Sequence, residues 1–131
     1  MHWTHTRVRY GETDQMGVVY HANYLVYFEL GRTELIRELG FPYAKFEEDG
    51  IRLPVVSTAL RFYSAARYDD EIAVGTRLTE VTAVRVRFDY EVRCDGTLLA
   101  TGHTVLACVG PEGRPRRFPA TIRERLEKHV Q

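Results

Sequence analysis

The sequence predicts an α+β domain in which one helix packs on an antiparallel β-sheet. One segment near the N-terminus, residues 22–39, has helical periodicity, and four segments with strand-like alternation follow it through short connections. Short turns cannot make the crossovers that parallel strands need, so the sheet is expected to be antiparallel. A helix layered on such a sheet is an α+β architecture. The 131 residues suit one core, and we expect a single domain over residues 1–131.

The first strand and the helix are predicted from two different periods. Uncharged side chains alternate with basic ones over residues 4–10, which indicates a strand. Over residues 22–39, apolar side chains recur every three or four positions, and the first half is apolar almost all round, as in a buried helix. Gly40 is expected to end this helix and Pro42 to prevent its continuation. A charged connection with a short helical turn is expected over residues 43–52.

Four further strands are predicted over residues 53–66, 71–81, 84–94 and 97–109. The dipeptide Asp95-Gly96 between the last two strands predicts a tight hairpin turn. The pattern Thr121-x-x-Glu124 resembles a capping box and predicts a short C-terminal helix. One helix would leave part of the sheet uncovered and at least one edge unpaired, so we expect the chain to form a dimer.

Composition and residue spacing argue against nucleic acid as a partner, a membrane span and a metal site. Eighteen basic residues balance eighteen acidic ones, whereas nucleic-acid binding needs an excess or a patch of positive charge. No apolar run is long enough to span a bilayer, and residues 1–5 lack the apolar core of a signal peptide, so a cytoplasmic location is expected. The histidines lack the spacing of metal ligands, and we expect no metal site. Cys94 and Cys108 fall at apolar strand positions and are expected to be buried thiols.

The polar loop before the helix is where chemistry is expected. Asp14 lies in this loop, and His21 and Asn23 stand where the helix starts. A helix N-terminus offers unpaired N–H groups that can bind an oxyanion, and a nearby carboxylate can act as a general base or a nucleophile. These are the parts needed for acyl transfer. The simpler alternative is an Asx-turn at Asp14 and helix caps at His21 or Asn23.

The segment YGETDQMGVVYHANYLVYFE, residues 10–29, resembles the signature of the 4-hydroxybenzoyl-CoA thioesterase family. That family includes the thioesterases associated with the Tol–Pal system. Residues 67–72 are similar to its second recurring stretch, and the likeness extends over residues 6–118. The resemblance implies a hotdog fold, a curved five-stranded antiparallel sheet wrapped around one long central helix. It also implies homodimers that pair into homotetramers, with active sites at the dimer interface.

The resemblance also implies roles for residues of the loop. The family's catalytic aspartate matches Asp14, within a Thr-Asp-x-x-Gly motif that ends at Gly17. The position whose N–H polarises the thioester carbonyl matches His21, while Tyr20 and Asn23 match positions that shape the pocket. The side chain of His21 either assists proton transfer or only caps the helix. Many relatives carry aspartate where this chain has Glu12, which leaves no role assigned to that residue.

Further candidates are charged residues outside the loop. Glu29 and Arg32 are three positions apart on the helix and are expected to form a structural ion pair, with Glu29 facing the active site as the alternative. The phosphates of coenzyme A need cations. The candidates, each also explicable as part of a solvated face, are Arg61, Arg67, Arg85 and Arg87.

The predicted function is therefore hydrolysis of an acyl-CoA thioester, with coenzyme A as part of the substrate and no other cofactor. One alternative is a hydratase of enoyl-CoA, which would need an acid/base pair that His21 and Glu29 fit poorly. The other is a non-catalytic protein that binds acyl-CoA or acyl-carrier protein, which would not need the carboxylate of Asp14.

Overall fold

The computed structural model describes residues 1–41 and 43–131. Pro42, which we expected to follow the end of the first helix, lies outside the described residues. The elements in chain order are β1 (His2–Arg7), the 3-10 turn η1 (Tyr10–Glu12), α1 (Asn23–Glu38), α2 (Tyr43–Glu48), β2 (Val55–Phe62), β3 (Glu71–Val81), β4 (Arg85–Cys94), β5 (Thr97–Ala107) and α3 (Ala120–Glu127).

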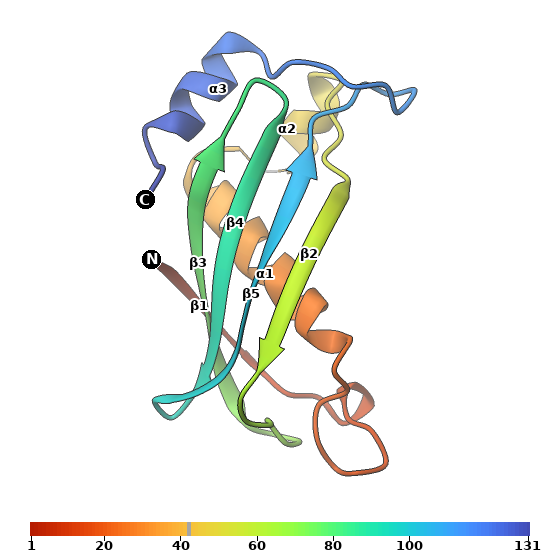
Figure 1. Cartoon of the computed structure of the whole chain (residues 1–131), viewed down its shortest axis with the longest axis vertical. Coiled ribbons are helices and arrows are strands. Elements are labelled where there is room, and N and C mark those ends of the chain that lie inside the picture. Colours follow the sequence, from red (N-terminus) through yellow and green to blue (C-terminus); the bar gives the residue numbers. More distant parts are fainter. Residues whose placement is uncertain (42) are drawn as a thin grey trace.

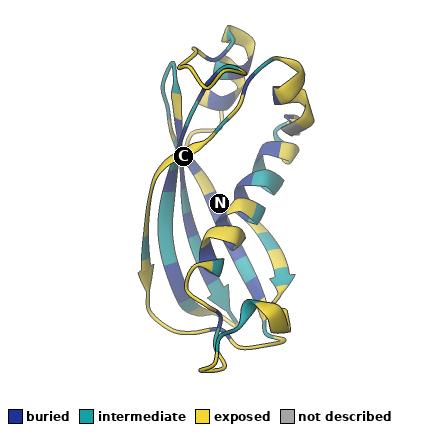
Figure 2. Ribbon diagram, turned by 90° about the vertical axis from the view of Figure 1, so that its right-hand side faces the viewer, coloured by how far each residue is buried: buried dark blue, intermediate teal, exposed yellow. Residues whose placement is uncertain are grey.

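The five strands form one sheet in the order β1-β3-β4-β5-β2, and every neighbouring pair is antiparallel (Figure 1). The predicted five-stranded antiparallel sheet is thus confirmed. Helix α1 crosses one face of it, and buried residues largely alternate with less buried ones along β3 and β4 (Figure 2). Strand β2 forms an outer edge and is almost entirely exposed.

The strand boundaries differ from the predictions where backbone pairing stops. Strand β3 has the predicted limits, and β4 and β5 match theirs to within two residues. Strand β1 starts earlier, because His2 already pairs with Thr76, and it ends at Arg7, before the turn η1. Strand β2 ends at Phe62, because the N–H groups of Tyr63 and Ser64 both turn to the carbonyl of Leu99.

The turn predictions have mixed outcomes. Asp95 and Gly96 both have positive φ, 47° and 81°, as the predicted hairpin turn requires. Gly40, with φ 92°, follows α1 as predicted. The capping box at Thr121 is wrong, because α3 begins one residue earlier and Pro119 occupies the N-cap without a side-chain hydrogen bond.

Helix α1 approaches the sheet closely through small residues. A Cβ added to Gly31 would lie 2.3 Å from Oγ1 of Thr76 and 2.8 Å from Cγ1 of Val74. Phe28 is fully buried and stacks on Tyr90 of β4, with ring centroids 4.3 Å apart. These contacts fix the height of α1 over the sheet, and with it the position of the helix N-terminus.

The prediction that the first half of α1 is buried all round is wrong for the single chain. Leu25 and Val26 lie on the side of the helix that faces away from the sheet, and they are 38% and 53% exposed. No helix in the described part of the chain is long and apolar enough to cross a membrane.

Candidate functional site

Asp14 occupies a tight turn between η1 and α1. Its N–H donates to the carbonyl of Val18 (2.9 Å), and its own carbonyl accepts from the N–H of Gly17 (3.0 Å). Gly17 has a φ of 80°, a conformation that favours glycine. The Oδ1 of Asp14 accepts from the N–H of Met16 at 2.9 Å, so the Asx-turn that we set against a catalytic role is present. Oδ2 of this half-buried carboxylate accepts no hydrogen bond from any described residue.

Two backbone donors stand just before α1. The N–H groups of His21 and Ala22 form no hydrogen bond with the part of the chain that the structure describes, whereas that of Asn23 already donates to the carbonyl of Tyr20. The N-cap is Ala22, and no side chain caps the helix, so a capping role for His21 is not realised. Its ring instead packs on that of Tyr20, with centroids 4.5 Å apart. Free donors at a helix N-terminus can bind an oxyanion.

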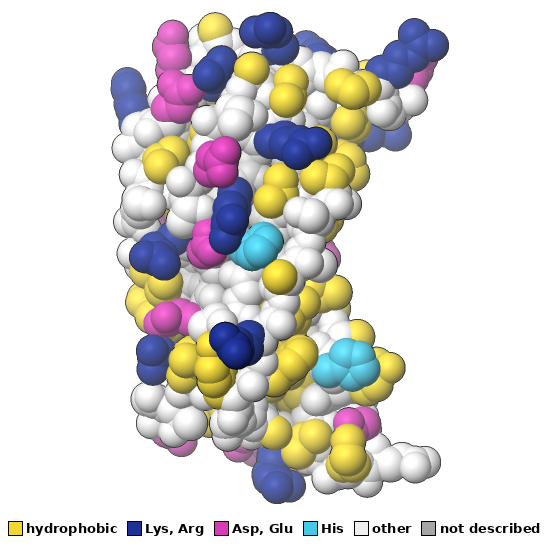
Figure 3. Space-filling view, in the orientation of Figure 1, with side chains coloured by type: hydrophobic (Ala, Val, Ile, Leu, Met, Phe, Trp, Pro, Cys, Tyr) yellow, Lys and Arg dark blue, Asp and Glu magenta, His cyan; other side chains and the backbone are white. Residues whose placement is uncertain are grey.

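An open pocket of about 330 Å³ lies beside these donors. It is lined by Val19, His21, Tyr24, Phe62, Tyr63, Ser64 and Ala65. The loop and the start of α1 thus form one wall, and the end of β2 with its following turn forms the other. Hydrophobic side chains gather along this side of the molecule, where its outline is indented (Figure 3).

Tyr24 joins the two walls. Its ring packs edge-on against Phe62, with centroids 5.3 Å apart. Burial raises the pKa of its hydroxyl, and a hydrogen bond with the backbone of Ala66 offsets this in part. The phenol therefore stays protonated and neutral, so the pocket wall carries aromatic surface without added charge.

Asn23 holds the loop and does not cap the helix. Its side-chain amide donates to the backbone carbonyl of Glu12 at 2.8 Å. The side chain of Glu12 accepts from the hydroxyl of Tyr27 on the next turn of α1, at 2.9 Å. Sequence reasoning assigned no role to Glu12 or Tyr27.

The candidate arginines are spread over different parts of the molecule. Arg67 lies beside the Asp14 turn: its Nη1 is 3.8 Å from where a Cβ of Gly17 would be, and its backbone pairs with Val18. Arg85 begins β4 at the opposite end of the sheet from the start of α1 (Figure 1). Of this group, the structure brings only Arg67 to the loop.

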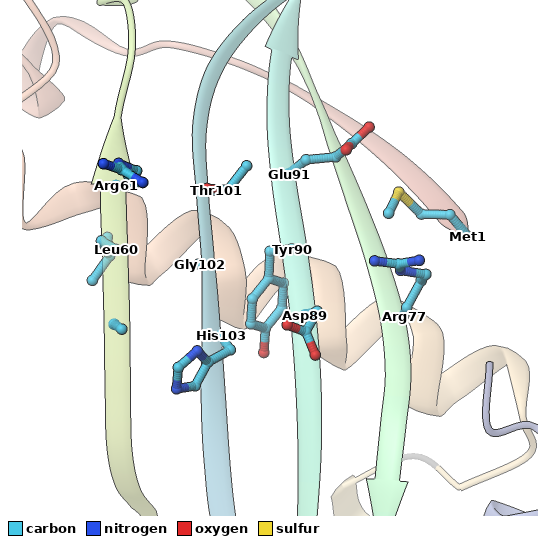
Figure 4. Close-up of a pocket in the computed structure, with 11 residues that line it drawn as sticks. Met1, Leu60, Arg61, Arg77, Asp89, Tyr90, Glu91, Thr101, Gly102 and His103 are labelled. Atoms are coloured by element: carbon cyan, nitrogen blue, oxygen red, sulfur yellow. The ribbon is translucent and has the colours of Figure 1, made fainter.

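Arg61 and Arg87 lie on the face of the sheet turned away from α1. Arg87 forms two hydrogen bonds of 3.1 Å with the carboxylate of Asp89, which raise its pKa. Arg61 lines a second pocket, of about 320 Å³, where it, His103, Asp89 and Arg77 project from four neighbouring strands (Figure 4). This pocket contains no residue of the 10–29 segment.

The predicted ion pair between Glu29 and Arg32 is wrong. No contact within salt-bridge distance joins these two side chains: Arg32 is 9% exposed and points to the interior, while Glu29 is exposed. Residues three positions apart lie only about 60° apart around a helix, but here the boundary between the buried and the solvated side of α1 falls between them. In the part of the chain that the structure describes, no group of three or more His, Cys, Asp or Glu side chains could hold a metal ion.

Sequence reasoning missed the second wall of the pocket. Phe62 and Tyr63 are 40 or more positions from the loop, and only the sheet topology brings the end of β2 beside α1. Tyr24 fell in the apolar half of the helix and resembled ordinary core. The one available signal was the aromatic pair Phe62-Tyr63 within the strand predicted over residues 53–66.

Comparisons with known proteins identify the family of the chain. The family model described as thioesterase-like superfamily matches residues 8–126. Putative acyl-CoA thioesterase YneP of Bacillus subtilis is 42% identical over 85 residues, a match that spans 65% of this chain and 62% of YneP. Acyl-CoA thioester hydrolase YbgC of Escherichia coli O6:H1 is 32% identical over 118 residues, 88% of each chain.

A solved structure gives the same result for the fold. The crystal structure of DHNA-CoA thioesterase from Staphylococcus aureus matches with a TM-score of 0.92 and 34% identity, covering 96% of this chain and 88% of that one. The family match spans most of the chain and the sheet topology agrees with it. The chain therefore belongs to the thioesterase-like superfamily, with a hotdog-type fold built on a five-stranded antiparallel sheet.

Proposed function

We propose that this protein is an acyl-CoA thioesterase that hydrolyses a thioester to a free acid and coenzyme A. One observation carries the proposal: a carboxylate with a free oxygen, Asp14, shares a loop with the free N–H groups of His21 and Ala22 beside an apolar pocket. The names of YneP, YbgC and the Staphylococcus aureus enzyme support the same reaction class.

The reaction needs few groups because a thioester carbonyl is strongly electrophilic. Asp14 either removes a proton from water as the water attacks the carbonyl carbon, or attacks that carbon itself to give an anhydride that water then cleaves. The N–H groups of His21 and Ala22 donate to the oxyanion that forms. The C–S bond then breaks, and coenzyme A leaves as the thiol. No metal or prosthetic group takes part in the proposed chemistry.

We further propose that the working site lies between two chains, in a homodimer that pairs into a homotetramer. The exposed edge of β2 offers unpaired backbone groups next to Phe62, and Leu25 and Val26 leave an apolar strip on α1. A second chain added at this edge would extend the sheet and cover the open pocket. Helix α1, 16 residues long, would be the long central helix around which the sheet of each chain wraps.

Arg67 is the best-placed residue for the phosphates of coenzyme A, because its guanidinium lies beside the Asp14 turn. The other three candidates do not lie beside the loop of the same chain. They would contact the substrate only across the interface with a neighbouring chain, or only if the substrate is long enough to extend to them: Arg61, Arg85 and Arg87. A cytoplasmic location is also proposed. It is supported by the free thiols of Cys94 and Cys108, which suit a reducing compartment.

The test is thiol release from a panel of aromatic and short to long aliphatic acyl-CoAs. We expect release from at least one class of substrate. Binding of acyl-CoA with no release from any member would instead indicate a binding protein, and hydration of an enoyl-CoA would indicate a hydratase. A monomer mass in light scattering at micromolar concentration would contradict the two-chain site.

A further inference from the structure

Glu12 connects the start of the Asp14 loop to the end of that loop and to α1. Its backbone carbonyl accepts from the side-chain amide of Asn23 (2.8 Å) and from the N–H of Tyr20 (2.9 Å). Its side-chain Oε1 accepts from the hydroxyl of Tyr27 (2.9 Å) and from the N–H of Arg9 (3.0 Å). Four hydrogen bonds from three parts of the chain therefore converge on one residue, and its Oε2 also pairs with Nε of the exposed Arg9 at 3.3 Å.

The two helix donors come from one face of α1. Asn23 and Tyr27 are four residues apart, so they lie one above the other along the helix. Asn23 holds the backbone of Glu12, and Tyr27 holds its carboxylate. Together they fix both the position and the orientation of the residue against the first turn of the helix.

The hydrogen bond between Tyr27 and Glu12 joins a buried hydroxyl to a partly buried carboxylate. The side chain of Glu12 is 18% exposed, and Tyr27 is buried. Burial first, and then the carboxylate of Glu12, raise the pKa of Tyr27, so its phenol remains a donor across the physiological range. Hydrogen bonds to an ionised, partly buried acceptor are roughly twice as strong as neutral ones.

The loop geometry links this contact to the proposed chemistry. Asp14 lies two residues after Glu12, and the oxyanion donor of His21 lies one residue after Tyr20. The carbonyl of Glu12 therefore bonds to the chain just before that donor. Inside the loop, the pairing of Thr13 with Val19 adds a further cross-link. Displacement of Glu12 would shift the carboxylate of Asp14 relative to the N–H of His21.

We propose that Glu12, held by Tyr27 and Asn23, is a positioning residue that sets the distance between Asp14 and the oxyanion donors. The inference rests on the proposed thioesterase function. Glu12 acts through Asp14 and contacts no reacting atom. The side-chain oxygen of Glu12 is needed as a hydrogen-bond acceptor for Tyr27, and the side chain takes no part in proton transfer.

Conservative variants separate this role from a direct one. Glu12→Gln keeps a side-chain oxygen that accepts from Tyr27, so we expect kcat within about threefold of wild type. A general base replaced by an amide would instead lose about 100-fold or more. Tyr27→Phe removes the donor, and we expect kcat to fall about tenfold with little change in KM. For Glu12→Ala we expect a loss approaching 100-fold, because misplacement by about 1 Å can cost that much.

The measurement is kcat and KM for each variant on the best acyl-CoA substrate, well below the melting temperature of the least stable variant. Tyr68→Phe is the matched control: Tyr68 is exposed and, among the described residues, its ring packs edge-on against Tyr10 alone, so the activity of this variant should equal that of wild type. Glu12→Ala is also made in an Asp14→Asn background and assayed in single turnover. A positioning residue should add no further loss there, although the melting temperature still falls.

Each result has one meaning. Full activity in Tyr27→Phe and Glu12→Ala, with an active wild type, would overturn the positioning role and leave the thioesterase proposal standing. Loss of activity in Glu12→Gln comparable to that in Glu12→Ala would overturn it in favour of a direct chemical role. An additional loss in the Asp14→Asn background would also overturn it. If the wild type released no thiol from any substrate, both proposals would fall.

Discussion

Gly31 is where α1 comes closest to the sheet, and its replacement by alanine tests whether that closeness positions the helix. The new Cβ would lie 2.3 Å from Oγ1 of Thr76 and 2.8 Å from Cγ1 of Val74. Ordinary carbon contacts are about 3.5–4.0 Å, so the helix or the strand would have to move by about 1 Å. Both neighbours are buried side chains on β3, and neither can turn away to solvent.

The expected effect follows from two opposing contributions. Overpacking of a core costs about 1–3 kcal/mol, and two contacts this short indicate the upper end. Alanine in place of glycine inside a helix stabilises by about 1 kcal/mol. We therefore expect Gly31→Ala to lower the free energy of unfolding by about 2 kcal/mol. For a chain of this size, that corresponds to a fall in melting temperature of roughly 6–10 °C.

The assay is urea unfolding at one fixed protein concentration, because association of chains would make stability depend on concentration. Gly110→Ala is the matched control, since nothing lies within 4 Å of its added Cβ. That variant should be unchanged or stabilised by up to about 1 kcal/mol. If Gly31→Ala were as stable as Gly110→Ala, the argument that close packing sets the height of α1 would be refuted.

Three further predictions concern the sheet. Gly96→Ala should destabilise by about 1 kcal/mol, because Gly96 has a φ of 81°, and urea unfolding measures it. Tyr90→Phe should cost about 1–3 kcal/mol in the same assay, because it leaves the buried Thr104 hydroxyl without its 2.6 Å partner. Burial pushes the pKa of Asp89 upward, but hydrogen bonds from Arg87 and Thr79 outweigh it and lower the pKa. Its stabilisation is present above about pH 4 and is lost as pH falls. Asp89→Asn should therefore be less stable than wild type at pH 7, with a difference that shrinks in acid.

Local patterns predicted the elements well because their causes are local. The alternation over residues 71–81 and the Asp95-Gly96 turn specify a strand and a hairpin without reference to the rest of the chain. The capping box at Thr121 failed because a proline two residues earlier already starts the helix. The pairing of Glu29 with Arg32 failed because helical spacing alone does not say which side of the helix is buried.

The candidate site was only half predictable. The loop from Asp14 to His21 is contiguous, so the sequence could indicate the carboxylate and the helix N-terminus together. The opposite wall, with Phe62 and Tyr63, is brought there by the pairing of β2 with β5, which no local pattern encodes. The contact of Glu12 with Tyr27 depends on how the loop folds back on α1, and a short-range motif cannot show that.

The most direct test of the central claim is the kcat/KM of Asp14→Asn for thiol release. Asparagine keeps the Oδ1 that accepts from Met16, so the turn should persist and the melting temperature should stay close to that of wild type. The variant loses only the carboxylate, and we predict a fall of about 100-fold to 10,000-fold. Full activity in a folded Asp14→Asn variant would contradict the assignment of the chemistry to Asp14.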